Sequence, residues 1–487
     1  MRMSASLAQK NINLLRGWPN SSLLPVAQLL DGAQTAFTTP SIYTPGLAYG
    51  PDPGYQPLRE EIARWLASSY PSPLQAAADP ETICISGGAS QNLACALQVF
   101  SDPAFTRKIF VVAPCYFLAC RIFEDAGFAG RLCAIPEGEE GVDLDSLRKG
   151  LEEVDEEDEK TPFKPARPWA KLYKSIIYCV PTFSNPSGKT MSMSCRQSLV
   201  KLARRHNSLI ISDDVYDFLS WSTSTSTSTS TTSPSSPGVP STLPRLIDID
   251  RSLDPIPGPE DFGHAMSNGS FSKIAGPGMR TGWADASRKL IYGLSQCGSS
   301  RSGGAPSQMS ATIMCSFLAS GALAKHIDEV LRPAYQRRWR IMVEAIEKYL
   351  LPLGIQMLNC SSSSPTTGTS ERTSSQGQDG AGIYGGYFIW LDLPTGVDAE
   401  TLVKYALQKE NLVVPAGPMF AVEGDQSLLF RNSIRLCFSW EAETDLAEGV
   451  KRLSRALRDV QSGKQLPPTD AHGLTGTELK QSMGEFQ

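Results

Sequence analysis

Histidine is scarce in this sequence of 487 residues, and its cysteines form no metal-binding pattern. No two of the four histidines (His206, His264, His326 and His472) form a ligand pair such as H-E-x-x-H, and the eleven cysteines include no C-x-x-C pair. The sequence therefore predicts no metal site, neither a histidine site nor a zinc ribbon. We expect the cysteines to be reduced, buried thiols of a cytoplasmic protein.

Long apolar runs and an excess of basic residues are also lacking. No run of about 18 apolar residues occurs, so we expect no transmembrane helix. The N-terminus, MRMSASLAQKNINLL, lacks the apolar region of a secretory signal, although its few basic residues leave an organellar signal open. A net charge of −5 argues against nucleic acid as a partner.

What is present is typical of a globular protein with alternating strands and helices. Hydrophobic residues make up 41% and charged residues 20% of the chain. Short apolar runs at 82–86, 109–112, 175–180 and 209–212 alternate with helical patterns, which predicts βαβ units and a mostly parallel sheet. We also expect a turn-rich loop over 43–54 and a long helical region over about 305–350.

Two low-complexity segments interrupt the chain. Residues 222–244 contain a Ser/Thr repeat, and residues 360–381 are similarly polar, so neither can bury apolar area, and both should be disordered. The predicted organisation is an N-terminal arm (1–45), a large domain (46–300), a smaller α+β domain (301–460) and a disordered tail (461–487).

A lysine in an unusual setting marks the stretch 267–283, SNGSFSKIAGPGMRTGW. Lys273 lies among hydroxyl residues and glycines, and Arg280 follows seven residues later. A desolvated lysine near other cations has a lowered pKa and can attack a carbonyl. Since the arginine and the hydroxyls suit a phosphate, the stretch suggests a phosphorylated aldehyde held as a Schiff base, as pyridoxal phosphate is.

Two other interpretations of this lysine stay open from the stretch alone. Ser270 and Lys273 fit the S-x-x-K pattern of serine β-lactamases, but the partner motifs S-D-N and K-T-G are lacking. Lys273 could also be a surface lysine in a Gly-rich loop.

A strand, a glycine loop and a helix follow one another at 82–100. The loop contains Gly88, Ala89 and Ser90, and this order aims backbone N–H groups and a helix N-terminus at an anion. A glycine pair before a helix can equally be an ordinary tight turn.

Side chains at strand ends face the ligand crevice of an α/β sheet. Tyr116 follows one predicted strand and could stack on an aromatic ring or be a core tyrosine. Asp213 ends another and could be a site carboxylate or a helix N-cap.

Taken in order, the motifs resemble those of the class I/II aminotransferases, the fold-type I enzymes that depend on pyridoxal phosphate. The motifs are Y-G-x-x-x-G-Y-x-x-L-R, S-G-G-A-S, A-P-x-Y, N-P-S-G, D-D-x-Y, S-x-S-K with R-x-G-W, G-G-Y-F-x-W and I-R-L-x-F-S. The resemblance covers about residues 10–460, and the N-terminal stretch is similar to fungal 2-aminoadipate and aromatic aminotransferases. It implies a large domain with a seven-stranded, mostly parallel sheet and a smaller α+β domain.

The resemblance implies a role for each residue around the cofactor ring. Lys273 would carry the cofactor as a Schiff base and then move a proton during the reaction. Asp213 would pair with the pyridinium nitrogen, and Tyr116 would stack on the ring. Tyr216 and Asn185 would hydrogen-bond its 3-oxygen.

The resemblance also implies a phosphate site and a substrate site. The phosphate would be held by Gly88, Ala89, Ser90, Ser270, Ser272 and Arg280. Tyr49 would reach it from a second subunit, which implies a homodimer with shared sites. Arg435 would bind the substrate α-carboxylate bidentately, with Gly17 and Asn185 nearby, but no second arginine is assigned to a substrate side chain.

The predicted activity is amino transfer between an α-amino acid and a 2-oxo acid, by a ping-pong mechanism. The substrate is expected to be bulky, aromatic or aminoadipate-like. Two rivals stay open: a carbon–sulfur lyase or aminocyclopropane-carboxylate synthase-like enzyme with the same residues, and a non-enzymatic regulator on the same fold. The regulator is disfavoured because the special lysine is present.

Overall fold

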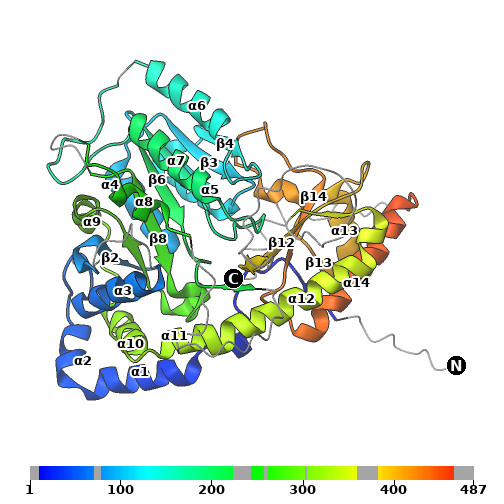
Figure 1. Cartoon of the computed structure of the whole chain (residues 1–487), viewed down its shortest axis with the longest axis horizontal. Helices are drawn as coiled ribbons and strands as arrows, with labels where there is room; N and C mark the ends of the chain where they lie inside the picture. Colours follow the sequence, from blue (N-terminus) through cyan, green and yellow to red (C-terminus); the bar gives the residue numbers. More distant parts are fainter. Residues whose placement is uncertain are drawn as a thin grey trace, which may run out of the picture.

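A computed structural model describes residues 10–70, 78–158, 160–222, 243–256, 262–301, 304–358 and 382–464. The predicted low-complexity segments and C-terminal tail lie outside these residues, apart from positions 222, 243–244 and 461–464. In Figure 1 a large sheet lies on the left and a small sheet on the right.

The large sheet has seven strands in the order β2-β9-β8-β6-β5-β3-β4. Only β9 runs antiparallel to its neighbours β2 and β8, and the other pairs are parallel. The predicted seven-stranded, mostly parallel sheet is therefore confirmed. The strands are β2 (Ile83–Ser86), β3 (Lys108–Ala113), β4 (Leu132–Pro136), β5 (Ser175–Cys179), β6 (Ser208–Asp213), β8 (Ala265–Ser270) and β9 (Gly282–Asp285).

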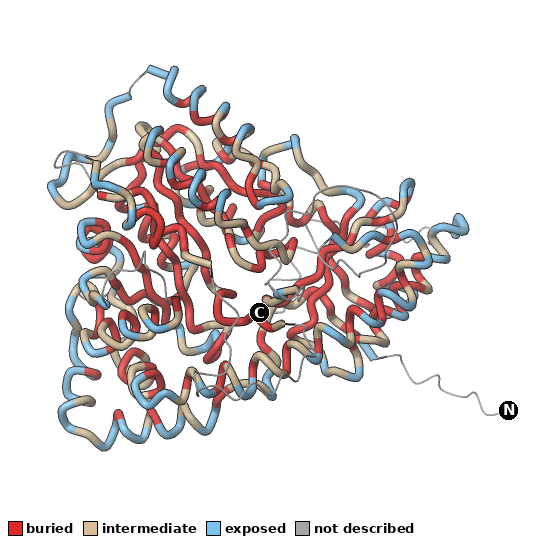
Figure 2. The backbone as a smooth tube through the Cα atoms, viewed as in Figure 1, coloured by how far each residue is buried: buried red, intermediate tan, exposed pale blue. Residues whose placement is uncertain are grey.

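Helices cover both faces of this sheet, which explains why the central parts of β3, β5 and β6 are continuous apolar runs. Successive side chains of a strand point to opposite faces, so Ile176 joins one core cluster and Ile177 the other. On the first face lie α4 (Ala89–Phe100), α5 (Phe117–Phe123) and α9 (Arg288–Ser295). On the second lie α6 (Leu144–Glu156), α7 (Met193–Arg205) and α8 (Leu246–Ser252). Figure 2 shows the strands buried between these exposed helix faces.

The small sheet is antiparallel and has the order β10-β12-β14. It is built from β10 (Gln356–Met357), β12 (Phe388–Asp392) and β14 (Ser433–Cys437), beside α12 (Arg332–Tyr349), α13 (Ala399–Glu410) and α14 (Glu443–Gln461). The N-terminal segment joins this part of the molecule, because β1 (Ile12–Asn13) pairs in parallel with β13 (Leu412–Val413).

The remaining elements correct one sequence-based prediction. The elements are α1 (Val26–Thr38), α2 (Pro40–Gly46), α3 (Gln56–Ser69), β7 (Ser220–Ser222), α10 (Gln308–Ala319), α11 (Ala322–His326) and β11 (Ile383–Gly385). The predicted loop over 43–54 is wrong at its start, where α2 continues to Gly46. Pro40 begins that helix at a position that proline favours.

The predicted long helical region over about 305–350 is present and consists of several helices. It breaks between α10 and α11 at Gly321, whose φ of +73° is left-handed. A π-helical turn over Ile327–Leu331 then leads into α12.

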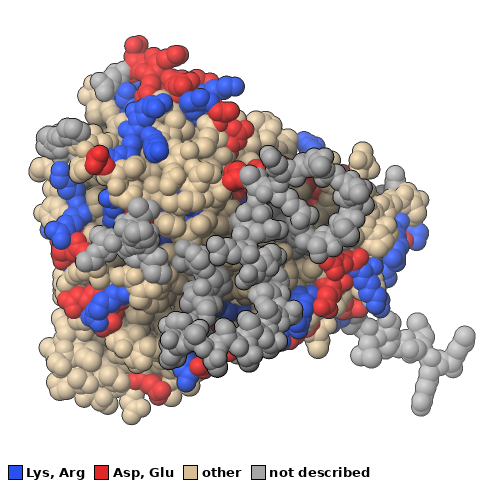
Figure 3. All heavy atoms as spheres, viewed as in Figure 1, with Lys and Arg blue, Asp and Glu red and all other residues tan. Residues whose placement is uncertain are grey.

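Acidic side chains gather at the top of the view in Figure 3, over the end of α6. Glu152, Glu153, Asp155 and Glu156 are exposed there, while Leu151 and Val154 face the core. This helix is therefore amphipathic, with a solvated acidic face. Among the described helices, none combines the length and the apolar character that a bilayer crossing requires.

Candidate active site

A cavity of about 1060 Å³ lies where the carboxyl ends of β5, β6 and β8 meet β12, β14 and the N-terminal segment. Most of the predicted site residues line it: Gly17, Ala89, Ser90, Tyr116, Asn185, Asp213, Tyr216, Ser270, Ser272, Lys273, Arg280 and Arg435. The structure thus brings together residues that are more than 400 positions apart in the sequence. Gly88 and Tyr49 are not among the lining residues.

Lys273 ends a short 3₁₀ turn directly after β8. Ser270 caps this turn, since its Oγ accepts a hydrogen bond from the backbone N–H of Ser272 at 3.1 Å. The Nζ of Lys273 donates to the backbone oxygen of Gly17 at 2.9 Å. Burial lowers the pKa of this amine from 10.5 to about 8. A neutral, nucleophilic amine is therefore accessible near neutral pH.

Asp213 ends β6 and brings a buried carboxylate to the same cavity. Its Oδ2 accepts a hydrogen bond from the Tyr178 hydroxyl at 2.8 Å. Its Oδ1 is buried and has no hydrogen-bond partner among the residues that the structure describes. Burial raises the pKa of Asp213 to about 6, while the bond from Tyr178 and the charge of Lys273 oppose this rise. Because an unsatisfied buried oxygen is costly, this geometry suits a bound group with an N–H donor.

Tyr178 was missed in the sequence because it lies in the apolar run of β5. In the sheet it pairs with Ile211 of β6. Positions 211 and 213 point to the same face, so Tyr178 reaches Asp213. The alignment of neighbouring strands was the missing information, and a lone tyrosine in an apolar strand carries no signal of its own.

The glycine loop before α4 has the geometry that an anion site requires. Gly88 adopts φ +106°, which side-chain-bearing residues rarely adopt. A Cβ there would lie 2.7 Å from Nη2 of Arg280, which donates to the backbone oxygen of Gly87 at 2.7 Å. Gly88 therefore lets the arginine approach the loop and the N-terminus of α4 closely.

Two further asparagines hold this loop, and neither was predicted. Asn268 of β8 is buried, and its Nδ2 donates to the backbone oxygen of Ala89 at 3.0 Å. Its Oδ1 accepts from Nδ2 of Asn92 in α4 at 2.8 Å. The loop is thus tied both to the lysine-bearing strand and to its own helix. Ser270 and Ser272 lie beside it, with 2.9 Å between their hydroxyl oxygens.

Arg435 of β14 lies on the opposite side of the cavity. Its Nη1 donates to Oδ1 of Asn185 at 2.8 Å, and its Nη2 donates to the backbone oxygen of Leu15. The guanidinium lies 4.1 Å from the ring centre of Phe388 and 4.6 Å from that of Phe420. Burial lowers the pKa of Arg435 to about 10, so the group stays cationic at neutral pH. A planar cation between apolar rings suits a carboxylate ligand.

The N-terminal segment connects the two cations of the site. Leu15 accepts from Arg435, and Gly17 accepts from Lys273. A Cβ on Gly17 would lie 2.7 Å from Cζ of Phe388, so glycine permits this close approach. The position predicted to lie near the substrate carboxylate is therefore at the cavity wall.

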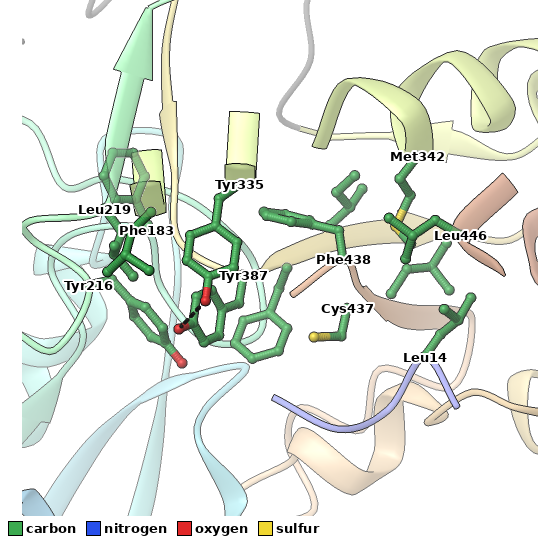
Figure 4. Close-up of a cluster of buried hydrophobic side chains, with 14 of the residues drawn as sticks. Leu14, Phe183, Tyr216, Leu219, Tyr335, Met342, Tyr387, Cys437, Phe438 and Leu446 are labelled. Atoms are coloured by element: carbon green, nitrogen blue, oxygen red, sulfur yellow. Dashed lines mark hydrogen bonds between the residues drawn. The ribbon is translucent and has the colours of Figure 1, made fainter. Parts of the chain in front are cut away.

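Two of the three tyrosines predicted for the site line the cavity, and the third does not. Tyr116 precedes α5 and lines the cavity, and burial raises its pKa to about 12. Tyr216 also lines it, with its ring 5.4 Å from that of Tyr387 and 6.0 Å from the Lys273 amine. Figure 4 shows this ring at the edge of the aromatic core, where a hydrogen bond joins the hydroxyls of Tyr335 and Tyr387. Tyr49 is 83% exposed, so its predicted contact with a partner's site stays a prediction.

The residues present fit pyridoxal phosphate. The free Oδ1 of Asp213 offers an acceptor for a protonated ring nitrogen, and Lys273 offers a desolvated amine for the aldehyde. The loop at Gly88 offers backbone N–H groups to the phosphate. Arg435 remains for a substrate carboxylate on the other side.

Comparisons with known proteins agree with this chemistry. The family model described as "Aminotransferase class I and II" matches residues 44–453. The chain is 31% identical to the uncharacterized protein YER152C of Saccharomyces cerevisiae, over 91% of this chain and 96% of that protein. It is 27% identical to aromatic-amino-acid aminotransferase 1 of Thermococcus litoralis, over 92% and 88% of the two chains.

A solved aminotransferase structure has the same fold as this chain. The kynurenine aminotransferase of Pyrococcus horikoshii, crystallised with PMP, superposes with a TM-score of 0.69 and 25% sequence identity. The alignment covers 93% of this chain and 92% of that one. The chain therefore belongs to the class I and II aminotransferases and is a fold-type I transaminase that uses pyridoxal phosphate.

Proposed function

We propose that this transaminase works through the residues that line the cavity, with Lys273 and Asp213 as its catalytic pair. The observation that carries this proposal is the pairing of a buried amine with a buried, half-satisfied carboxylate in one cavity. Tyr116 would cover one face of the cofactor ring, and Tyr216 and Asn185 would bind its 3-oxygen. The phosphate would lie against Gly88, Ala89, Ser90, Ser270, Ser272 and Arg280.

When bound, pyridoxal phosphate supplies an aldehyde and an electron-accepting ring for amino-group transfer. Lys273 takes a proton from the substrate Cα and returns one during the exchange, as its lowered pKa favours. Asp213 keeps a negative charge beside the ring nitrogen and so holds a proton there. Arg435 binds the substrate α-carboxylate with both Nη atoms and orients Cα toward Lys273.

The substrate class proposed is an α-amino acid with a bulky, aromatic or aminoadipate-like side chain. The cavity of about 1060 Å³ would also hold the cofactor, and the apolar residues that line it, among them Phe117, Leu407 and Val413, suit a bulky side chain. The Thermococcus litoralis and Pyrococcus horikoshii relatives are named for aromatic amino acids and kynurenine, respectively. No observation in the described cavity favours the carbon–sulfur lyase or the aminocyclopropane-carboxylate synthase-like alternative over amino transfer.

A product assay tests the function directly. The purified holoenzyme is incubated with single amino acids from a panel, with and without 2-oxoglutarate. Transfer predicts glutamate formation that depends on the 2-oxo acid, in a 1:1 ratio with the new 2-oxo acid. Release of pyruvate, ammonia or thiol without an acceptor would instead identify a lyase.

The lysine assignment predicts a pH dependence for cofactor attachment. In the cofactor-free protein the neutral amine is the reactive form, so the rate should rise with pH through a midpoint near 8. Stopped-flow absorbance measures this rate, and free hexylamine is the control for titration of the cofactor itself. A midpoint near the ordinary lysine value of 10.5 contradicts the proposed environment of Lys273.

We further propose a cytoplasmic homodimer. Val26, Leu30 and Phe37 form an exposed apolar face on α1, and Leu47 and Tyr49 extend it. A second copy would cover such a face and would bring Tyr49 to the neighbouring phosphate site. Analytical ultracentrifugation of the holoenzyme measures the oligomeric state, and a monomer at micromolar concentration contradicts the shared site. The described cysteines are free thiols, as suits a reducing compartment.

A further inference from the structure

Tyr387 contacts Lys273 from the other part of the molecule. It lies directly before β12 of the small sheet and is fully buried. Its hydroxyl donates to the backbone oxygen of Lys273 at 3.1 Å, across 114 positions of the sequence. Since Lys273 follows β8 of the large sheet, this hydrogen bond ties the lysine to the part of the molecule built around the small sheet.

A second tyrosine directs the hydroxyl of Tyr387. Tyr335 of α12 is also buried, and its hydroxyl lies 3.1 Å from that of Tyr387 (Figure 4). A hydroxyl has one hydrogen, and Tyr387 gives its own to Lys273, so Tyr335 is the donor within the pair. Burial raises the pKa of both tyrosines above the ordinary value of 10, so both stay protonated at neutral pH. The hydrogen bonds therefore run in one direction, from α12 through Tyr387 to Lys273.

The ring of Tyr387 also lies beside the lysine amine. Its centre is 5.5 Å from Nζ of Lys273, and the ring of Tyr216 is 6.0 Å from the same atom. The two rings meet at 63° with their centres 5.4 Å apart. Aromatic rings at this distance attract a cationic amine and limit the space in which its side chain can turn. Tyr387 thus contacts Lys273 at two places, the backbone and the amine.

The backbone of Tyr387 is itself held on both sides. Its oxygen accepts from the N–H of Phe438, directly after β14, at 3.0 Å. The N–H of Gly386 donates to the backbone oxygen of Leu219, directly before β7, at 2.9 Å. Gly386 has a φ of +69°, and a Cβ there would lie 2.8 Å from Cβ of Phe183, so glycine permits this close approach. A residue supported in this way can keep a neighbouring group in place.

Tyr387 and Tyr335 are not among the residues that line the described cavity, so they meet the site through Lys273. We propose that Tyr387 is a positioning residue for Lys273, which holds the lysine backbone and confines the amine to its path between the cofactor and the substrate Cα. The proposal rests on the proposed function of Lys273. The motif G-G-Y-F-x-W contains Tyr387, but only the contact between the two parts of the molecule reveals its role.

Removal of the single hydroxyl tests this role in half-reactions of the holoenzyme with one amino acid at a time. For Tyr387→Phe we expect the maximal rate to fall about 3- to 10-fold, the factor to which one neutral hydrogen bond corresponds. The half-saturating concentration should change less than about twofold, because Arg435 and the cavity walls are untouched. Tyr335→Phe should lower the rate less, because Tyr387 keeps its bond to Lys273.

Tyr405→Phe is the matched control for the loss of a buried tyrosine hydroxyl. Tyr405 lies on α13 and is buried, and its hydroxyl donates to Oδ2 of Asp459 at 3.0 Å. It is not among the residues that line the described cavity. The maximal rate of this variant should stay within about twofold of the wild type.

Attachment of pyridoxal phosphate to the cofactor-free chain provides a second readout that needs no turnover. In Tyr387→Phe the attachment rate should fall by the same factor at every pH, while its midpoint near 8 stays in place. The reason is that the hydroxyl contacts a carbonyl oxygen and not the amine, so it affects position and not charge. Stopped-flow absorbance measures the rate and the midpoint together.

Unchanged rates of transfer and attachment in Tyr387→Phe overturn the proposal, and so does a loss that Tyr405→Phe shares or a clear shift of the attachment midpoint. A larger loss in Tyr335→Phe than in Tyr387→Phe contradicts the order of the contacts. If Tyr387→Phe does not fold, Tyr387→Met, which also lacks the hydroxyl, is judged by the same comparisons. A wild-type enzyme that transfers no amino group from any amino acid refutes the proposed function, whereas the attachment rates still test Tyr387 in that case.

Discussion

Replacing Lys273 by alanine should lower the rate of amino transfer by at least about 10³-fold, the largest effect expected in this protein. Loss of a positioned acid–base group alone costs about 10²- to 10⁴-fold, and this substitution also removes the covalent anchor. Borohydride should fix the cofactor to the wild-type chain and not to the variant. Mass spectrometry of the reduced protein measures the bound mass.

We expect this loss of transfer rate and of cofactor attachment for Lys273 and not for an exposed lysine elsewhere. Lys325→Ala is the matched control, since that lysine is 72% exposed on α11 and pairs only with Glu329 among the described contacts. It should leave rate and attachment within about twofold of the wild type. If Lys273→Ala still carried a borohydride-fixed cofactor, another amine would be the anchor.

Asp213→Asn should lower turnover by about 10²- to 10³-fold, the range measured when one preorganised electrostatic partner is removed. The substitution keeps the size of the side chain but removes the charge that would face the ring nitrogen. It should also move the midpoint of cofactor attachment to lower pH, because the charge of Asp213 raises the pKa of Lys273. Stopped-flow absorbance measures both effects.

Tyr178→Phe tests how much of the rate depends on the hydrogen bond to the Asp213 carboxylate rather than on its charge. It removes one hydrogen bond to Asp213 and leaves the charge in place. Its effect on turnover should therefore be clearly smaller than that of Asp213→Asn. Near-normal turnover in Asp213→Asn would exclude the electrostatic role of this residue.

The sequence predicted four strands of the large sheet, β2, β3, β5 and β6, because each carries its own apolar run. The strands β4, β8 and β9 were not predicted. Apolar runs such as the one ending at Asp213 are bounded by polar residues and turns, and burial on both faces demands such runs. The residues at the strand ends could be placed for the same reason. Local pattern also located Lys273, because hydroxyl and glycine neighbours surround it.

Other parts of the site depend on contacts that no local pattern contains. Tyr178 and Asn268 act across strands, so only the register of the sheet reveals them. The N-terminal segment lies at the cavity, and it is held there in part by the pairing of β1 with β13, about 400 residues away along the chain. The break at Gly321 has little signal in the sequence, because one glycine within a helical pattern is often tolerated.

The contacts of the N-terminal segment are expected to form late when this enzyme folds. Its carbonyl oxygens accept hydrogen bonds from Lys273 and Arg435, which lie 256 and 420 residues further along the chain, and residues 12 and 13 pair with 412 and 413. During synthesis the residues of this segment emerge hundreds of residues before their partners do. Contacts over such separations form late, since the loop must close before they contribute. The catalytic cavity is therefore completed only after the chain has been made as far as Arg435.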